Sequence, residues 1–201
     1  YLEIMNYSFT GRKEIAKLGL PESDLRMQPM AIRNPLGEDT AVMRPTLVCD
    51  MLKTLSFNMN HATESASLYE MAAVFDPHHP TAEGLPTETQ TLCMGIYGED
   101  ADFFALRGAV EALLNACGIS CEVEAGGDCY YHPGRCARLV RGQQVFAVLG
   151  EVHPTVREAF DMPRRAIVAE INLAQLLEYG KPMGEMKPLP RFPSMSRDLA
   201  L

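Results

Sequence analysis

One short connection between two strand-like segments constrains the fold more than any other feature. Residues 136–140 (CARLV) and 144–152 (QVFAVLGEV) are rich in apolar and β-branched side chains, and only Arg141, Gly142 and Gln143 separate them. Parallel strands need a crossover of a dozen or more residues, so a link this short makes the two strands pair antiparallel. The sequence therefore predicts a sheet that contains hairpins.

Further strand-like segments alternate with helical patterns along the chain. Extended structure is expected at residues 2–9, 25–32, 67–75, 89–98, 119–124 and 165–171. Helices are expected from Thr10 to near Gly19 and at residues 45–60, 102–117, 154–160 and 172–180. Strands at hairpin spacing with several helices between them predict an α+β fold, in which helices flank a mostly antiparallel sheet.

Local signals mark the ends of these helices. Asp102 and Asn172 stand where N-caps are expected, and Gly118 stands at a C′ position. Pro154 and Pro45 are each expected at a first helical position. The helix at residues 45–60 carries an apolar stripe at helical spacing, made of Leu47, Val48, Met51, Leu52, Leu55 and Met59.

Charge and cysteine content narrow the functional class. The formal net charge of −8 disfavours broad electrostatic binding of nucleic acid. Residues 130–201 nevertheless carry 10 basic and 7 acidic side chains, which leaves open whether Arg135, Arg138 and Arg141 contact RNA or are solvated strand positions. No apolar run reaches the length of a membrane span. The 6 cysteines lie mostly among apolar neighbours, so we expect free thiols in a cytoplasmic protein.

Cys129, His132 and Cys136 are three possible metal ligands within eight residues, and His153 follows downstream. Structural zinc sites usually combine two paired clusters, whereas only one cluster stands out here. The other interpretation is structural: residues 132–134 (HPG) form a turn, and Arg135 begins a strand. A metal-dependent enzyme centred on these four residues is thus one hypothesis, and a generic acidic interaction domain is another.

Motifs for phosphate binding are missing. The sequence contains neither G-x-x-x-x-G-K-[ST] nor G-x-G-x-x-G. Glu70, Glu151 and Glu170 lie within predicted strands. Such a carboxylate is catalytic only when it points into a cleft, and the sequence does not decide in which direction each one points.

Seven stretches in the same order resemble the β subunit of bacterial phenylalanyl-tRNA synthetase over essentially the whole chain. They are EIMNYSF (3–9), residues 32–60 from IRNPLGED to LSFNMN, LYEMAAVF (68–75), FFALRGAVEALL (103–114), YHPGRCARLV (131–140), LGEVHPTV (149–156) and FPSMSRDLAL (192–201). The resemblance implies the class II aminoacyl-tRNA synthetase fold. It assigns residues 1–185 to a catalytic-like module, and residues 186–201 to a linker and the start of a C-terminal domain similar to an anticodon-binding fold.

The resemblance also implies that this module does not catalyse and holds neither cofactor nor metal. Class II active sites hold the ATP α-phosphate with an arginine that follows a strand, yet the matching segment has Leu68 where this arginine is needed and keeps Glu70. The later glycine-rich segment corresponds to VAEINLAQLL (168–177), which has neither glycine nor arginine. ATP and magnesium are then expected elsewhere in the whole enzyme.

What the resemblance leaves for this segment is assembly. It implies an (αβ)2 heterotetramer with the catalytic α subunit, acting on tRNA(Phe). The helix at residues 45–60 matches an interface-forming region, so we expect contacts with the α subunit at Arg44, Leu47, Val48, Met51, Leu52 and Leu55. Two departures from the family wording are Pro45, where a small hydroxyl residue is usual, and Cys136, where a residue such as serine is usual. Both ends of the chain look cut, and we expect a longer protein.

Overall fold

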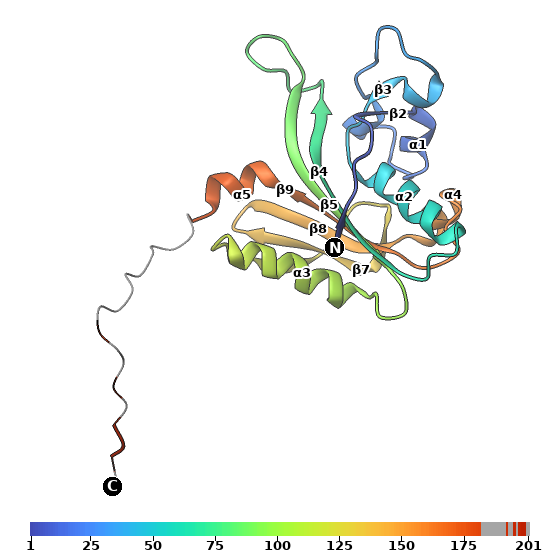
Figure 1. Cartoon of the computed structure of the whole chain (residues 1–201). Helices are drawn as coiled ribbons and strands as arrows, with labels where there is room; N and C mark the ends of the chain where they lie inside the picture. Colours follow the sequence, from blue (N-terminus) through green and yellow to red (C-terminus); the bar gives the residue numbers. More distant parts are fainter. Residues whose placement is uncertain (182–191, 193–194, 196, 200–201) are drawn as a thin grey trace.

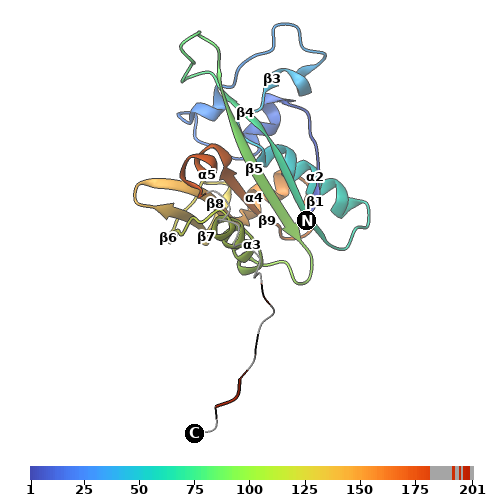
Figure 2. The same cartoon turned by 60° about the vertical axis from the view of Figure 1, so that its left-hand side comes forward.

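A seven-stranded sheet forms the centre of the computed structural model, which describes residues 1–181, 192, 195 and 197–199 (Figures 1 and 2). Its strands run in the order β1-β4-β5-β9-β8-β7-β6. All neighbouring pairs are antiparallel except β1 and β4. The predicted α+β fold with a mostly antiparallel sheet is confirmed. The strand bounds are Leu2–Glu3 (β1), Ala66–Asp76 (β4), Thr87–Tyr97 (β5), Glu122–Ala125 (β6), Tyr131–Arg141 (β7), Gln144–Val152 (β8) and Ile167–Asn172 (β9).

Two hydrophobic clusters lie on opposite faces of the sheet. Along β5, Cys93 and Tyr97 belong to one cluster, whereas Met94 and Ile96 belong to the other, as the alternation of side chains in a strand requires. Helices α1, α2 and α4 contribute to the first cluster, and α3 and α5 to the second. The helix bounds are Arg12–Ala16 (α1), Val48–Asn60 (α2), Phe103–Ala116 (α3), Pro154–Ala159 (α4) and Leu173–Tyr179 (α5).

Helix α2 packs closely on strand β5. A Cβ atom on Gly95 would lie 2.8 Å from the Met51 sulfur and 2.9 Å from Leu55 Cδ1. The glycine thus lets the helix approach the strand. The first turn of α2 then meets Glu170 on β9, where the Leu47 amide donates a 2.9 Å hydrogen bond to the Glu170 carboxylate.

The prediction of one strand over residues 2–9 is wrong for residues 4–8, which are not part of a strand. Only β1 and β2 (Phe9–Thr10) are extended pairs, and β2 pairs with β3 (Val42–Met43) in a separate two-stranded sheet. Between them the Asn6 backbone and side-chain amides donate to the Glu70 carboxylate at 3.1 and 2.8 Å. These bonds to a residue 64 positions away replace strand pairing.

The extended segment expected at residues 25–32 is also largely wrong. Leu25–Met27 form a 3-10 helix, η1, and the Asp24 carboxylate caps it by accepting from the Arg26 amide at 2.9 Å. Ala31 makes only an isolated bridge. A second 3-10 helix, η2 (Glu38–Thr40), follows.

Pro45 does not occupy the first position of α2, because the helix begins three residues later at Val48. The Thr46 hydroxyl accepts a 3.1 Å hydrogen bond from the Val48 amide, so the chain turns into the helix at Thr46. Caps expected at Asp102 and Asn172 are confirmed, since their side chains accept from Ala105 and Gln175.

The turn expected at residues 132–134 lies instead inside β7, where the register shifts between Tyr131 and Cys136. Opposite this bulge stands Gly150, where a Cβ atom would lie 2.6 Å from Cys136 Cβ and 2.9 Å from the Arg135 carbonyl oxygen. In a bulge, one strand has more residues than the stretch of partner strand opposite it. Because Gly150 has no side chain, the bulged part of β7 can lie close to β8. The hairpin at Gly142, with φ of +62°, is as expected.

The last expected domain, residues 186–201, and the boundary before it lie mostly outside the described residues. Helices within the described part of the chain are all too short or too polar to cross a membrane.

Candidate functional site

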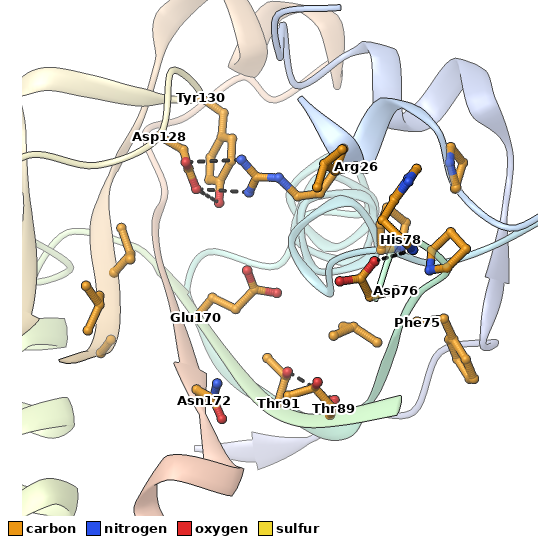
Figure 3. Close-up of a pocket in the computed structure, with 18 of the residues that line it drawn as sticks. Arg26, Phe75, Asp76, His78, Thr89, Thr91, Asp128, Tyr130, Glu170 and Asn172 are labelled. Carbon is orange, nitrogen blue, oxygen red and sulfur yellow. Dashed lines mark hydrogen bonds and ion pairs between the residues drawn. The ribbon is translucent and has the colours of Figure 1, made fainter. Parts of the chain in front are cut away.

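A cavity of about 330 Å³ opens on the face of the sheet that α2 covers, beside residues 74–78, where β4 ends (Figure 3). Strands β4, β5, β8 and β9 provide its floor, and η1 and the segment before β7 provide one side. Its volume is at the lower end of the range for small-molecule pockets. The charged side chains that line it are Arg26, Asp76, Asp128 and Glu170, with His78 beside them.

Arg26 is held by two aspartates. Its guanidinium donates to Asp24 at 2.8 Å and to Asp128 at 3.0 Å, and it lies over the ring of Tyr130, whose hydroxyl donates to Asp128 at 2.7 Å (Figure 3). Burial acts to lower the pKa of Arg26, but the bonds to the aspartates outweigh it and raise that pKa. Burial likewise acts to raise the pKa of Asp128, and the bonds from Arg26 and Tyr130 lower it. The Arg26 guanidinium is therefore protonated, and the two aspartates already balance its positive charge.

Glu170 points into the open centre of the cavity (Figure 3). One carboxylate oxygen, Oε1, accepts from the Thr46 hydroxyl at 2.8 Å and from the Leu47 amide at 2.9 Å. Burial raises the pKa of Glu170 in spite of these two bonds, which act to lower it. The sequence did not decide between an inward and an outward carboxylate at this position, and the structure places it inward.

The rest of the lining is apolar or neutral. Thr91 donates its hydroxyl to the Thr89 carbonyl at 3.3 Å, and the side-chain oxygen of Asn172 is used as the cap of α5. Val74 and Val148 add apolar wall. With one arginine against three carboxylates, the cavity has the wrong charge to hold a polyphosphate, which needs cations that are free to bind it.

Of the two segments matched to a phosphate site, the one around Leu68 and Glu70 lies outside the cavity, whereas the one at residues 168–177 lines it with Glu170 and Asn172. Leu68 is in the core. Glu70 is buried and accepts a 2.8 Å bond from the Arg44 guanidinium. Residues 168–177, which matched the glycine-rich segment, form most of β9 and the start of α5. The chain therefore offers no arginine to a phosphate at either of these positions.

All six side chains expected to contact the α subunit are buried by this chain itself. Arg44 is 2% exposed, and the other five, Leu47, Val48, Met51, Leu52 and Leu55, are 0% exposed. Their apolar stripe is explained by packing on β5 and the first hydrophobic cluster. A role for these six at a subunit contact stays a prediction.

The possible metal ligands do not come together. Cys129 contacts the carbonyl oxygens of Leu18 and Gly19, His132 accepts from the Gly134 amide, and His153 bonds Thr155. The Cys136 sulfur lies 3.9 Å from the Pro133 carbonyl oxygen. In the described part of the chain, no three His, Cys, Asp or Glu side chains are grouped so that they could hold a metal ion.

The arginines of β7 are exposed. Arg135 donates to Glu151 at 2.7 Å, and contact of Arg135, Arg138 or Arg141 with RNA stays a prediction. Sequence reasoning missed the cavity residues Arg26, Asp128 and Tyr130. Arg26 and Asp128 stand 102 positions apart and carry no motif that links them.

Three kinds of comparison place the chain among known proteins. Residues 1–173 match the family described as "Phenylalanyl tRNA synthetase beta chain CLM domain". The chain is 37% identical over 201 residues to the phenylalanine–tRNA ligase β subunit of Clostridium acetobutylicum, covering 99% of this chain and 25% of that protein. The corresponding subunit of Symbiobacterium thermophilum is 34% identical, with 99% and 23% covered. This chain thus spans about a quarter of the length of these relatives.

Among solved structures, the fold is similar to that of pyrrolysyl-tRNA synthetase from Desulfitobacterium hafniense. The TM-score is 0.68 at 14% sequence identity, and the match covers 88% of this chain and 62% of that one. At this identity the likeness concerns the fold, which is that of a class II synthetase. Together with the family match over most of its length, this shows that the chain belongs to the phenylalanyl-tRNA synthetase β chain family.

Proposed function

We propose that this chain is a non-catalytic class II-like module that supports ATP-dependent phenylalanylation of tRNA by assembling with the catalytic α subunit. The active enzyme is then a cytoplasmic (αβ)2 heterotetramer. ATP, magnesium and tRNA(Phe) are bound by other parts of it. The relatives that carry the name phenylalanine–tRNA ligase β subunit support this proposal, as does the charge of the cavity.

The observation that carries the non-catalytic part is the pairing of Arg26 with Asp24 and Asp128 at 2.8 and 3.0 Å. A triphosphate in this cavity would have to displace two carboxylates from the guanidinium. It would also approach Glu170 and Asp76, whose negative charges repel it. An ATP site needs the opposite arrangement.

The assembly part is supported by exposed apolar side chains near α2. Met5 is 91% exposed, Tyr7 76% and Phe57 62%. The N-terminal segment runs beside α2 in both views (Figures 1 and 2), and the Thr54 hydroxyl of the helix lies 3.3 Å from the Asn6 side-chain oxygen. We name Met5, Tyr7 and Phe57 the N-terminal apolar surface. It is this outward surface, rather than the buried stripe, that we propose meets the α subunit.

Titration calorimetry with ATP and magnesium tests the non-catalytic part. We expect no saturable binding by the 201-residue chain at millimolar nucleotide. We also expect no exchange of pyrophosphate into ATP in the presence of phenylalanine. Saturable binding at one site per chain, lost in Arg26→Met and retained in the exposed variant Arg138→Met, would contradict the proposal.

A further inference from the structure

The cavity contains one carboxylate oxygen that the fold leaves unbonded. Asp128 has both oxygens bonded by Arg26, and Asp76 has both bonded by His78 and His79. Glu170 differs, because within the described residues only its Oε1 accepts hydrogen bonds. We propose that the cavity binds a small organic cation, a primary amine with an apolar tail, whose ammonium group bonds the second oxygen of Glu170.

The second carboxylate oxygen of Glu170 is available to accept a hydrogen bond from a ligand in the cavity. Glu170 is partly buried, and its carboxyl group faces the cavity. An ammonium group that binds the free oxygen forms a charge-assisted hydrogen bond, which is stronger than a bond between neutral groups. The N-terminus of α2 already bonds Oε1 and leaves the second oxygen to the cavity.

Charge around Glu170 selects a cation over an anion. Arg26 is the one arginine among the described lining residues, and two aspartates already bond it. The lining thus holds three carboxylates against one guanidinium, a formal balance of −2 with His78 neutral. An ammonium group entering the cavity reduces this imbalance, whereas a carboxylate or phosphate increases it.

The walls set the size and nature of the tail. Val74, Phe75 and Val148 add apolar surface to the lining. Val148 is the cross-strand partner of Glu170, whereas Val74 pairs with Thr89 on the neighbouring strand. Thr91 and Asn172, which also pair, add polar groups to the lining (Figure 3). A volume of about 330 Å³ is at the lower end of the range for small-molecule pockets, so the cavity suits a small ligand. A single ring or short chain with one amino group fits this description.

The inference goes beyond the assembly role and does not depend on it. Binding of an amine uses the cavity, whereas the proposed subunit contact uses the N-terminal apolar surface. Measurements on the isolated 201-residue chain therefore test the amine site alone. If they fail, the assembly proposal is untouched, and a failure to bind the α subunit leaves the amine site untouched.

Benzylamine and its neutral analogue benzyl alcohol are the probes, measured by protein-observed NMR titration. We expect benzylamine to bind about 10-fold or more tightly than the alcohol, because charge-assisted bonds are stronger than neutral ones. Glu170→Gln should abolish the preference. In that variant the amide oxygen still accepts from Thr46 and Leu47, so α2 keeps its cap. Glu178→Gln, an exposed change on α5, should leave the preference intact.

Equal binding of the two probes, no binding of either, or an undiminished preference in Glu170→Gln would overturn the proposal. Should Glu170→Gln fail to fold, carboxyl ¹³C titration of the wild-type chain decides instead. Saturating benzylamine must then lower the pKa of Glu170, because a nearby positive charge favours the ionised form. An unchanged pKa would overturn the proposal as firmly as the other results.

Discussion

Arg44 is a fully buried cation that links three parts of the chain. Its Nη1 donates to Glu70 at 2.8 Å and to the Tyr7 carbonyl at 3.2 Å, and its Nε donates to the Ala73 carbonyl at 3.1 Å. Asp50 on α2 lies 4.0 Å from the same Nη1, and its nearer oxygen has no hydrogen-bond partner within the described residues. Of the two carboxylates that face this guanidinium, only Glu70 is hydrogen-bonded to it.

Asp50 should make stability fall with rising pH. Burial raises the pKa of Asp50 from 3.8 to about 6, against the opposing effects of Lys53 and Arg44, while Glu70 adds to the rise. The folded state thus holds a proton that the unfolded state has released, and this stabilisation is lost as pH rises from about 4 through about 6.

Asp50→Asn removes the buried charge at little change in shape. We expect the variant to be more stable than the wild type by about 2–3 kcal/mol at pH 7.5, with a much smaller difference near pH 4. Urea unfolding at the two pH values measures this. Asp100→Asn, an exposed change, serves as control and should have no effect. A gain from Asp50→Asn that is equal at both pH values would show that the charge of Asp50 is not responsible.

At the scale of elements, local sequence signals located some segments and failed at others. The caps at Asp102 and Asn172 and the spacing of the β7–β8 hairpin involve residues close in sequence, and those elements were predicted well. The segment around Asn6 was not, because its partner Glu70 is 64 positions away. The same applies to the cavity, since the sequence carries no sign that Arg26 meets Asp128.

The β7 bulge depends on the absence of a side chain at Gly150. Gly150→Ala places a Cβ atom against the Arg135 carbonyl, so strand β7 must shift. We expect a loss of about 1–3 kcal/mol in the free energy of unfolding. Gly108→Ala is the matched control, because a Cβ atom there meets nothing within 4 Å. It should stabilise α3 by up to about 1 kcal/mol. Thermal unfolding of both variants checks this, and equal melting temperatures would refute the steric explanation.

At the scale of the whole molecule, a class II fold is combined with a cavity whose charge is opposite to that of an ATP site. Helices α2 and α3 pack on opposite faces of the sheet (Figures 1 and 2). The fold could be predicted from strand spacing, and the family from short stretches of sequence. The residues that line the cavity could not be predicted, because they are far apart in the sequence and come together only in the folded chain.

Sedimentation velocity of the 201-residue chain mixed with its cognate phenylalanyl-tRNA synthetase α subunit tests the central claim most directly. We predict a complex heavier than either chain. Phe57→Asp on the N-terminal apolar surface should weaken it at least about 10-fold, since one buried aromatic contact contributes more than 1.4 kcal/mol. Leu177→Asp, at a side chain that is 83% exposed on α5, should leave it unchanged. Two chains that sediment separately at tens of micromolar, with both folded, would contradict the account.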